Sequence, residues 1–223
     1  MAIPARTGER SVHNLHTPWG WPLLIGVVTC AANQHRVQAQ QETWVPWATR
    51  DVRFFDGKTL GVPDDYDALA RKTEALCRYA LDAGYDRLLK IDDDGWINFR
   101  KFKVVEADYA GIRNANYASG GAYWLSRRSM EIIVRGGIDD IAEDRGVGKR
   151  LAQHGIPLTE LPDYIWQGAG LATGIAGASA CPCSECKKLG GKPVWEYFPD
   201  AAVITQLGPE AMRACHKFYT ENG

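Results

Sequence analysis

The segment from residue 22 to residue 30, PLLIGVVTC, most constrains the fold of this chain. It is a continuous apolar run rich in β-branched residues, which is typical of a strand buried on both faces. A polar, helix-compatible stretch follows at 32–44, and DVRFFDG (51–57) has the pattern of a second strand that ends in a glycine turn. Strands buried on both faces occur mainly in α/β proteins, so this region predicts a parallel sheet covered by helices.

The clearest helix is expected at 64–84, where apolar residues recur at helical spacing. Asp64 or Asp65 can cap its start, and Gly84 ends it. An apolar strand, YDRLLKI, follows at 85–91. Further elements are expected along the rest of this region: strands at 108–113 and 120–127, and helices at 128–137 and 143–155. Strands alternating with helices predict an α/β fold with a mostly parallel sheet.

The chain divides into three regions by composition. Residues 1–21 are interpreted as a flexible arm, 22–166 as the α/β core, and 167–223 as a small cysteine-containing segment that begins with a Gly/Ala-rich loop or lid. No apolar run approaches the roughly 20 residues that span a bilayer, and the start lacks the apolar core of a signal peptide. We therefore expect a bacterial or host-cell cytoplasmic protein. A formal net charge of −1 gives no support to bulk nucleic-acid affinity.

Three adjacent acids, Asp92, Asp93 and Asp94, follow directly after the strand expected at 85–91. In open α/β sheets, ligands bind beyond the carboxyl ends of the strands. Neighbouring carboxylates repel one another unless a cation offsets their charge, and such oxygens select Mg²⁺ or Mn²⁺. A solvated acidic turn is the alternative for the triplet alone. Its position at the end of a buried strand, with Lys90 beside it, favours the metal.

Side-chain directions alternate along a strand, so Asp92 and Asp94 are expected to face one way and Asp93 the other. Such a D-x-D pair can hold one ion, which can bind a diphosphate and neutralise a leaving group. A second acidic site, Glu143 and Asp144, opens the helix expected at 143–155. These acids can simply complement the helix dipole. Alternatively, one of them can be a general base that deprotonates a hydroxyl acceptor.

Several ordered segments carry a further pattern: QETW (41–44), DDYDALARKT (64–73), LLKIDDD (88–94), YASGGAYWLSRRSM (117–130) and EDRGVGKRLAQHGI (143–156). Together they resemble, in order and spacing, the motifs of the β1,3-galactosyltransferase and Fringe-like glycosyltransferases. The resemblance extends from about residue 24 to residue 156. It implies a GT-A fold, a Rossmann-like and mostly parallel sheet flanked by helices. It also implies a nucleotide-sugar donor, usually a UDP-sugar, with Mn²⁺ and a single displacement that inverts the anomeric carbon.

The same resemblance implies roles for individual residues. Asp92 and Asp94 would serve the metal and the donor ribose, and Asp144 would be the general base. Gly120 and Gly121, which lack a Cβ, would let the backbone approach the donor sugar. The remaining donor-binding residues implied are Thr29, Arg36, Asp65, Lys72, Lys90 and Asp93.

The sequence also departs from that family. Gln41 stands where an arginine is usual, and Arg145 and Gly146 replace apolar and aromatic residues. The family supplies a late histidine as a further metal ligand, and here only His154 and His216 follow the acids. His216 is the better candidate by its order in the chain.

Three cysteines, Cys181, Cys183 and Cys186, gather in the sequence CPCSEC. In a reducing compartment such a cluster favours metal over a disulfide. Structural Zn²⁺ needs four ligands, and Cys215 or His216 could supply the fourth. Disulfides and free thiols remain the alternatives.

The leading hypothesis is a soluble, metal-dependent, inverting glycosyltransferase of bacterial or viral type. Its acceptor is left open among a glycan, a protein side chain, a lipid-linked sugar and a hydroxylated base of phage DNA. The basic FRKFK stretch (99–103) could contact a phosphorylated acceptor or simply be a solvated face. A metal-dependent phosphoryl transferase or nuclease would need a second set of acids around two ions. A zinc-knuckle nucleic-acid-binding protein is the non-enzymatic alternative, which the near-neutral charge disfavours.

Overall fold

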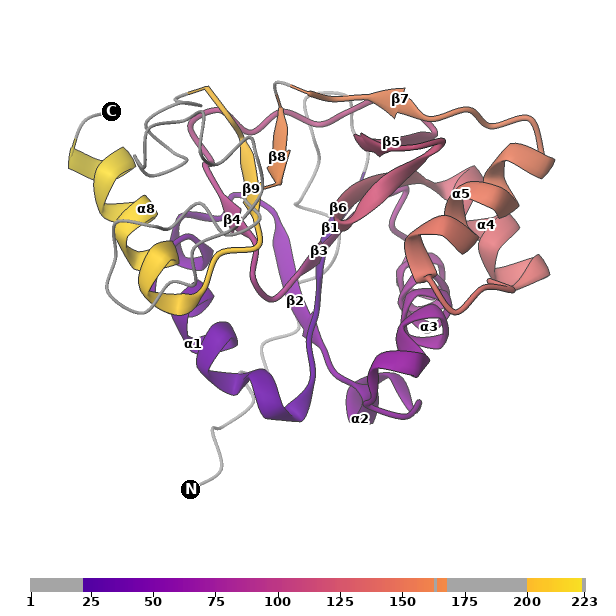
Figure 1. Ribbon diagram of the computed structural model, residues 1–223, viewed down its shortest axis with the longest axis horizontal. Helices are drawn as coiled ribbons and strands as arrows, with labels where there is room; N and C mark the ends of the chain where they lie inside the picture. Colours follow the sequence, from indigo (N-terminus) through magenta and orange to yellow (C-terminus); the bar gives the residue numbers. More distant parts are fainter. Residues whose placement is uncertain (1–21, 163, 168–199, 222–223) are drawn as a thin grey trace.

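A six-stranded sheet forms the centre of the computed structural model, which describes residues 22–162, 164–167 and 200–221. The strand order is β2-β1-β3-β6-β5-β7 (Figure 1). The strands are β1 (Leu23–Val28), β2 (Asp51–Phe55), β3 (Arg87–Asp92), β5 (Tyr109–Asn114), β6 (Tyr117–Ser126) and β7 (Thr159–Glu160). β1 pairs in parallel with β2 and β3, and β5 pairs in parallel with β7. Only β6 runs against its neighbours, so the predicted mostly parallel sheet is confirmed.

Helices cover both faces of this sheet. The α-helices are α1 (Gln34–Glu42), α2 (Gly57–Leu60), α3 (Leu69–Asp82), α4 (Arg127–Gly136), α5 (Glu143–Gln153) and α8 (Pro209–Glu221). Short 3₁₀ turns are η2 (Ala31–Asn33), η3 (Val45–Trp47) and η4 (Tyr66–Ala68). α3, α4 and α5 pack together on one side, while α1 and α8 lie together on the other (Figure 1). In the described part of the chain, no helix is long and apolar enough to cross a membrane.

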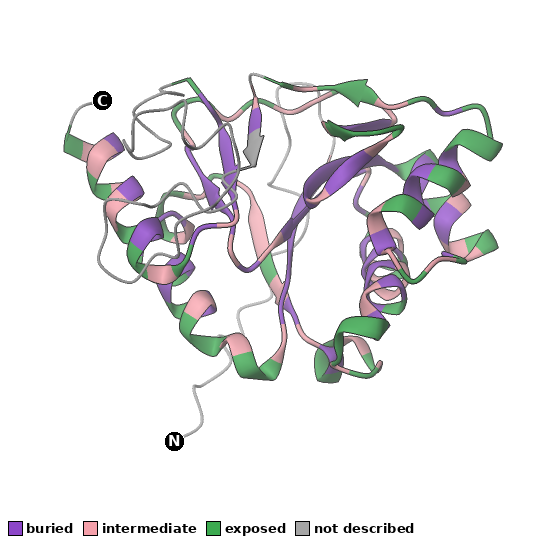
Figure 2. Cartoon of the chain, in the orientation of Figure 1, coloured by how far each residue is buried: buried purple, intermediate pink, exposed green. Residues whose placement is uncertain are grey.

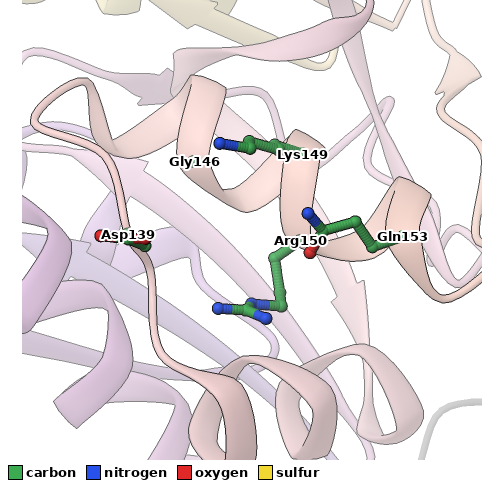
Figure 3. Close-up of a pocket in the computed structure, with 5 residues that line it drawn as sticks. All are labelled: Asp139, Gly146, Lys149, Arg150 and Gln153. Carbon is green, nitrogen blue, oxygen red and sulfur yellow. The ribbon is translucent and has the colours of Figure 1, made fainter.

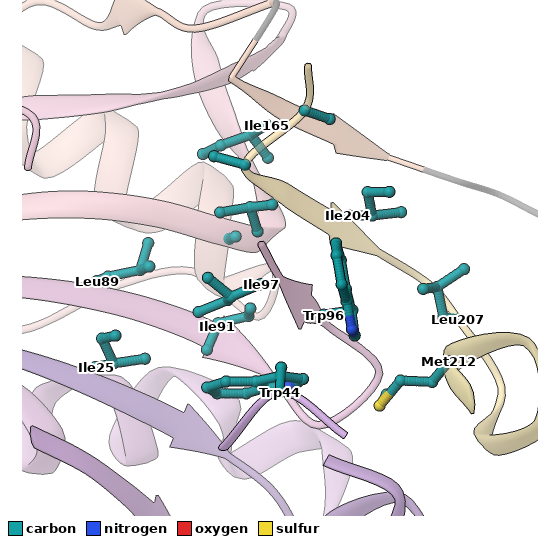
Figure 4. Packing of buried hydrophobic residues seen from close by; sticks show 14 of the residues in the cluster. Ile25, Trp44, Leu89, Ile91, Trp96, Ile97, Ile165, Ile204, Leu207 and Met212 are labelled. Atoms are coloured by element: carbon teal, nitrogen blue, oxygen red, sulfur yellow. The ribbon is translucent and has the colours of Figure 1, made fainter. Parts of the chain in front are cut away.

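Strand β1 shows why the chain needs both helical layers. All six of its residues are buried, as the apolar run predicts (Figure 2). Leu24 and Val28 join the apolar cluster beneath α3, α4 and α5. The cluster on the opposite face of the sheet contains Leu23, Ile25 and Val27. It also contains Trp44, which follows α1, and residues of α8 (Figure 4). The two-residue period of a strand thus divides one apolar run between two cores.

A second, three-stranded sheet joins the C-terminal part of the chain to the segment that follows β3. Its order is β4-β9-β8, with β4 (Trp96–Ile97) antiparallel to β9 (Val203–Thr205) and β8 (Ile165–Gln167) parallel to it. The domain boundary expected at residue 166 falls inside β8. Residues 201–204 are buried in the same apolar cluster as β1 and β3. The described part of the C-terminal segment is therefore packed as part of the core.

Most predicted elements are present, with adjusted ends. The helix expected at 64–84 is η4 followed by α3, and Asp65 caps its start by accepting the Ala68 N–H at 2.9 Å. β6 begins at Tyr117, three residues before the expected strand, and a tight turn with Ala115 at φ 57° joins it to β5. The predicted arm 1–21, most of the Gly/Ala-rich loop, and Cys181, Cys183 and Cys186 lie outside the described residues.

Candidate functional site

The three acids after β3 have different surroundings. Asp92 is the last residue of β3, and its carbonyl accepts the Gly95 N–H at 3.0 Å, which closes a turn. The side chain of Asp93 is 5% exposed, whereas those of Asp92 and Asp94 are 36% and 23% exposed. The middle acid is thus buried and the outer two reach solvent, but only Asp92 lies in the strand, so the turn formed by Asp93 and Asp94 sets this arrangement and not strand alternation.

Asp93 is an anchor for the connection between β1 and α1. Its carboxylate accepts hydrogen bonds from Thr29 Oγ1 at 2.8 Å, Asn33 Nδ2 at 2.9 Å and Arg36 Nη1 at 3.0 Å. Burial alone would lower the pKa of Arg36, but Asp93 and Asp94 raise it above its usual value. Thr29 and Arg36, expected to meet a nucleotide, are thus held beside the acids by Asp93. Asn33 was not anticipated, because nothing in its sequence neighbourhood marks it.

Gln40 of α1 and Trp44, two residues after the end of that helix, hold the backbone of the acidic turn. Gln40 Nε2 donates to the carbonyls of Gly95 at 2.8 Å and Asp92 at 3.2 Å. Trp44, fully buried, donates its indole N–H to the same Gly95 carbonyl at 3.1 Å. These contacts give Trp44 of the QETW motif a structural reason: it fixes the turn that presents the acids.

The C-terminal segment reaches the acids from the other side. The N–H of Gln206, just after β9, donates to Asp94 Oδ1 at 3.3 Å, and the N–H of Leu207 donates to the Asp94 carbonyl at 2.8 Å. Arg36 Nη1 lies 3.7 Å from Asp94 Oδ2. Burial raises the pKa of Asp94 above its usual value despite these contacts.

Lys90 lies behind Asp92 on the same strand. Its side chain is 2% exposed, and Nζ donates to Asp92 Oδ1 at 2.6 Å and to the Gly120 carbonyl at 2.5 Å. Glu143 Oε2 lies 3.8 Å away. Burial opposes the charged form of Lys90, but Asp92 and Glu143 raise its pKa above the usual value. Burial also raises the pKa of Asp92 to about 7, outweighing the opposing charge of Lys90.

Asp144 faces β6 from the first turn of α5. Its Oδ2 accepts the Gly120 N–H at 3.1 Å, and its Oδ1 accepts the N–H of Arg145 at 2.8 Å. The Arg145 side chain pairs instead with Asp140, 2.7 Å away. A Cβ on Gly120 would lie 3.3 Å from Asp144 Oδ2. Lys90, Gly120 and Asp144 therefore form a continuous chain of contacts between the acids of β3 and the start of α5.

Gly121 has a different neighbour. A Cβ there would lie 2.7 Å from Oγ1 of Thr205, which is 1% exposed on β9. The space beside both glycines is thus used by side chains of this chain. Gly121 allows β6 and β9 to approach each other, a packing reason for glycine that holds before any ligand is considered.

Two other expected donor-binding residues lie under the β1–α1 connection. Lys72 is 2% exposed, and its Nζ contacts Asp64 Oδ1 at 2.6 Å and the Thr29 carbonyl at 3.0 Å. Asp64 also accepts the N–H of Ala31 at 2.6 Å. Lys72 therefore supports the loop that carries Thr29, and Asp65 serves as a helix cap.

The late histidine and cysteine lie on α8, packed among aromatic and apolar residues. The ring of His216 lies 6.0 Å from that of Trp47 and 6.3 Å from that of Trp96, and burial lowers its pKa. Cys215 is fully buried in the apolar cluster, which raises the pKa of its thiol well above the usual value and favours a packed thiol. Over residues 22–162, 164–167 and 200–221, no three His, Cys, Asp or Glu side chains gather as a metal site.

The outer two acids nevertheless have oxygens suited to a cation that arrives with its ligand. Lys90 takes Oδ1 of Asp92, and the Gln206 N–H takes Oδ1 of Asp94. The second oxygen of each carboxylate belongs to a side chain that reaches solvent, and that of Asp94 also lies 3.7 Å from Arg36 Nη1. Mg²⁺ and Mn²⁺ are commonly held by one or two carboxylates together with substrate phosphates and water. The residues present fit that arrangement, with Asp92 and Asp94 as the protein ligands.

A small pocket opens elsewhere, on the outer side of α5 (Figure 3). It is lined by Asp139, Gly146, Lys149, Arg150 and Gln153. None of the β3 acids lines it. Arg150 there donates to the carbonyls of Gly137 at 2.8 Å and Gly136 at 2.5 Å, so it closes the end of α4.

The sheet, its helical layers and the acids after its third strand define a GT-A-like Rossmann fold. Among solved structures with this fold is the "crystal structure of a glycosyltransferase involved in the glycosylation of the major capsid of PBCV-1". The match has a TM-score of 0.55 and 10% sequence identity, and covers 87% of this chain and 98% of that one. No protein-family model and no curated protein matches the sequence. At this identity the likeness shows the fold alone.

Proposed function

We propose that this chain is a glycosyltransferase that moves a sugar from a nucleotide-sugar donor, of which a UDP-sugar is the first choice, to a hydroxyl acceptor. Asp92 and Asp94 would hold a divalent cation, Mn²⁺ or Mg²⁺, against the donor diphosphate. Asp144 would be the general base, and the reaction would invert the anomeric carbon. The fold, the motif resemblance to Fringe-like enzymes and the solved glycosyltransferase of similar fold support this proposal.

One observation carries most of the weight. Asp92, the solvent-reaching acid that ends β3, is linked to the carboxylate of Asp144 through only two intermediates, Lys90 and the Gly120 peptide. An acidic turn that served only solubility would need no such connection. A transfer reaction does need it, because the group that stabilises the leaving diphosphate and the base that activates the acceptor must keep a fixed separation.

The chemistry follows from these positions. Asp144 accepts the proton of the acceptor hydroxyl while the acceptor oxygen forms a bond to the anomeric carbon. The bond between that carbon and the β-phosphate oxygen breaks, and the electron pair leaves with the nucleoside diphosphate. The cation, when bound, neutralises charge developing on that diphosphate. Lys90 and Arg36 hold the acids in place, and their two positive charges offset part of the repulsion within the triplet.

The described residues do not favour a nucleic-acid acceptor. Within the basic stretch 99–103, Lys101 pairs with Asp200 at 2.7 Å and Arg100 donates to the Tyr219 carbonyl at 3.2 Å. These two cations are thus engaged by α8 and by Asp200, whereas Lys103 of the same stretch is exposed. A glycan, protein or lipid-linked acceptor remains open, as does a DNA base that is bound without this stretch.

The first test is nucleotide binding measured by thermal shift. UDP, GDP and ADP are each added with and without Mn²⁺, and we expect one nucleotide, UDP in the first instance, to raise Tm only when Mn²⁺ is present. Indifference to all three would contradict the proposal. A screen of nucleotide sugars for donor hydrolysis then identifies the sugar.

Two substitutions separate the proposed roles. Asp94→Ala should abolish metal-dependent nucleotide binding, whereas Asp144→Asn should keep binding and lower turnover by about 10²–10⁴-fold. Asp139→Asn, at an exposed acid in the loop before α5, is the matched control and should leave both unchanged. Unaltered UDP–Mn²⁺ affinity in Asp94→Ala would remove the metal role, and wild-type turnover in Asp144→Asn would remove the base.

A further inference from the structure

Glu143, the residue before Asp144, is a buried carboxylate that the proposed reaction does not use. It is 6% exposed, and α5 begins at this residue. The preceding residue, Ala142, provides no side-chain cap. No N-cap side chain therefore fixes the first turn of α5, although Asp140 in the preceding loop accepts the Ala142 N–H at 3.0 Å and binds the Arg145 guanidinium at 2.7 Å.

Three other elements hold Glu143 instead. Thr73 Oγ1 of α3 donates to Glu143 Oε1 at 2.8 Å, and the hydroxyl of Tyr123 on β6 donates to the same oxygen. Lys90 Nζ of β3 lies 3.8 Å from Oε2. A buried carboxylate is costly unless it is paired and hydrogen-bonded, and here hydrogen bonds satisfy one oxygen while a buried cation faces the other.

These contacts reach Asp144 in two ways. Asp144 follows Glu143 in the same helical turn, so fixing one residue fixes the direction of the next. Lys90, which faces Glu143, also binds the Gly120 carbonyl at 2.5 Å, and the N–H of Gly120 binds Asp144 at 3.1 Å. Gly120 has no ladder partner in the pairing of β6 with β3 or β5, so the hydrogen bond from its backbone N–H to the Asp144 carboxylate depends directly on the position of α5.

We propose that Glu143 is a positioning residue: together with Lys90 it fixes the first turn of α5 and thereby sets Asp144 at the distance from the β3 acids that transfer requires. The effect of Glu143 on catalysis rests on the proposed function. The structural part of this role, the control of the Gly120–Asp144 contact by Glu143, holds in the free protein and can be tested there.

The test measures hydrogen exchange of the Gly120 amide in ligand-free protein. Thr73→Val removes one hydroxyl donor to Glu143 from the buried face of α3 and leaves Lys90, Gly120 and Asp144 themselves unchanged. We expect Gly120 exchange to accelerate about three- to tenfold, the effect of losing one typical hydrogen bond while Tyr123 still donates to the same oxygen. Thr73→Ser, which keeps the hydroxyl, should exchange like the wild type.

Glu143→Gln gives the stronger perturbation, because it keeps the shape and removes the charge that faces Lys90. We expect roughly tenfold or faster Gly120 exchange and a similar fall in kcat, with the donor KM within about twofold. The matched control is Glu74→Gln. Glu74 is likewise a hydrogen-bonded glutamate, which accepts the N–H of Ile138 in the loop before α5, but it does not face Lys90. It should leave Gly120 exchange and kcat unchanged.

The outcomes distinguish this inference from the proposed function. Wild-type Gly120 exchange in both Thr73→Val and Glu143→Gln would overturn the positioning role, whether or not the enzyme transfers sugar. Equal acceleration in Thr73→Ser or Glu74→Gln would also overturn it, because the effect would then be general loosening. If exchange responds as expected but the wild type transfers no sugar from any donor, the proposed function fails while the positioning contact stands.

Discussion

Replacing Gly121 with alanine tests how closely the C-terminal segment packs against the candidate site. Gly121 is buried in β6, and an added Cβ would lie 2.7 Å from Oγ1 and 3.0 Å from Cβ of Thr205. Carbon atoms in contact prefer about 3.5–4.0 Å, so β9 or β6 must move. The backbone at Gly121 is not in the left-handed region, so alanine itself is compatible with it.

The magnitude follows from two opposing effects. Overpacking of this kind costs about 1–3 kcal/mol, while replacing glycine restricts the unfolded chain and returns about 0.4–1 kcal/mol. We expect a net loss of roughly 0.5–2 kcal/mol in the free energy of unfolding. For a chain of this size each kcal/mol lowers Tm by roughly 2–4 °C. Gly208→Ala is the matched control, because a Cβ there meets nothing within 4 Å.

Thr205→Ala supplies the second half of the test. It removes Oγ1 and Cγ2, two of the three atoms that an alanine at 121 would meet. In a double-mutant cycle measured by urea unfolding, we expect Gly121→Ala to cost about 1 kcal/mol less in the Thr205→Ala background. Nucleotide binding by the double variant should be closer to that of the wild type than nucleotide binding by Gly121→Ala alone. A Gly121→Ala cost no larger than that of Gly208→Ala, or one that Thr205→Ala leaves unchanged, would refute this packing.

Three further predictions concern the acids and the cysteines. Asp93→Ala should lower the free energy of unfolding by about 2–3 kcal/mol, because it leaves three donors without this acceptor. Asp94→Ala should lower it by less than about 1 kcal/mol. If urea unfolding gave the reverse order, the surroundings assigned to the two acids would be contradicted. Because Asp92 has a raised pKa of about 7 and binds a cation only when ionised, Mn²⁺-dependent UDP affinity should fall about tenfold per pH unit below pH 7, and a flat profile by calorimetry would exclude it as a ligand. If the cysteines of 181–186 hold structural zinc, elemental analysis should show about one Zn per chain, and none would end that hypothesis.

The main elements of the fold were predictable because their signals are local. β1 is apolar at every position, and α3 carries apolar residues at helical spacing, so both could be placed within a few residues. The direction of β6 was also accessible in principle. Only Ala115 and Asn116 separate β5 from β6, and so short a link permits an antiparallel hairpin but no parallel crossover.

The second sheet was not predictable in the same way. β4 and β9 are short strands of two and three residues, and neither carries enough residues for a periodic signal. They are defined by pairing across more than a hundred residues, Trp96 with Ile204 and Ile97 with Val203. Long-range pairing of this kind depends on how β3 and the core below it are already arranged.

The candidate site likewise has residues that the sequence alone predicts and residues that only long-range contacts reveal. The acids after β3 and Asp144 could be found from the sequence, because the triplet follows directly after a buried strand and both sites lie in segments that resemble ordered motifs of a known family. The residues that hold them could not, since Asn33, Gln40 and Glu143 become important only through contacts with distant segments. Lys72, for which the motif resemblance implied a donor-binding role, supports the β1–α1 loop from below.

These contacts explain how three adjacent acids can be accommodated without requiring the same role of each. Asp93 is neutralised within the chain by Arg36 and satisfied by two further donors, so it needs no external cation. Asp92 shares the buried charge of Lys90 but retains a raised pKa, and Asp94 has only a partly exposed Arg36 at 3.7 Å. The three carboxylates are thus matched by only two cations, Lys90 and Arg36, and the remaining negative charge is shared by the two acids that reach solvent. A cation bound with a diphosphate would supply charge where the protein leaves it lacking, which is why metal dependence should follow Asp92 and Asp94, and stability should follow Asp93.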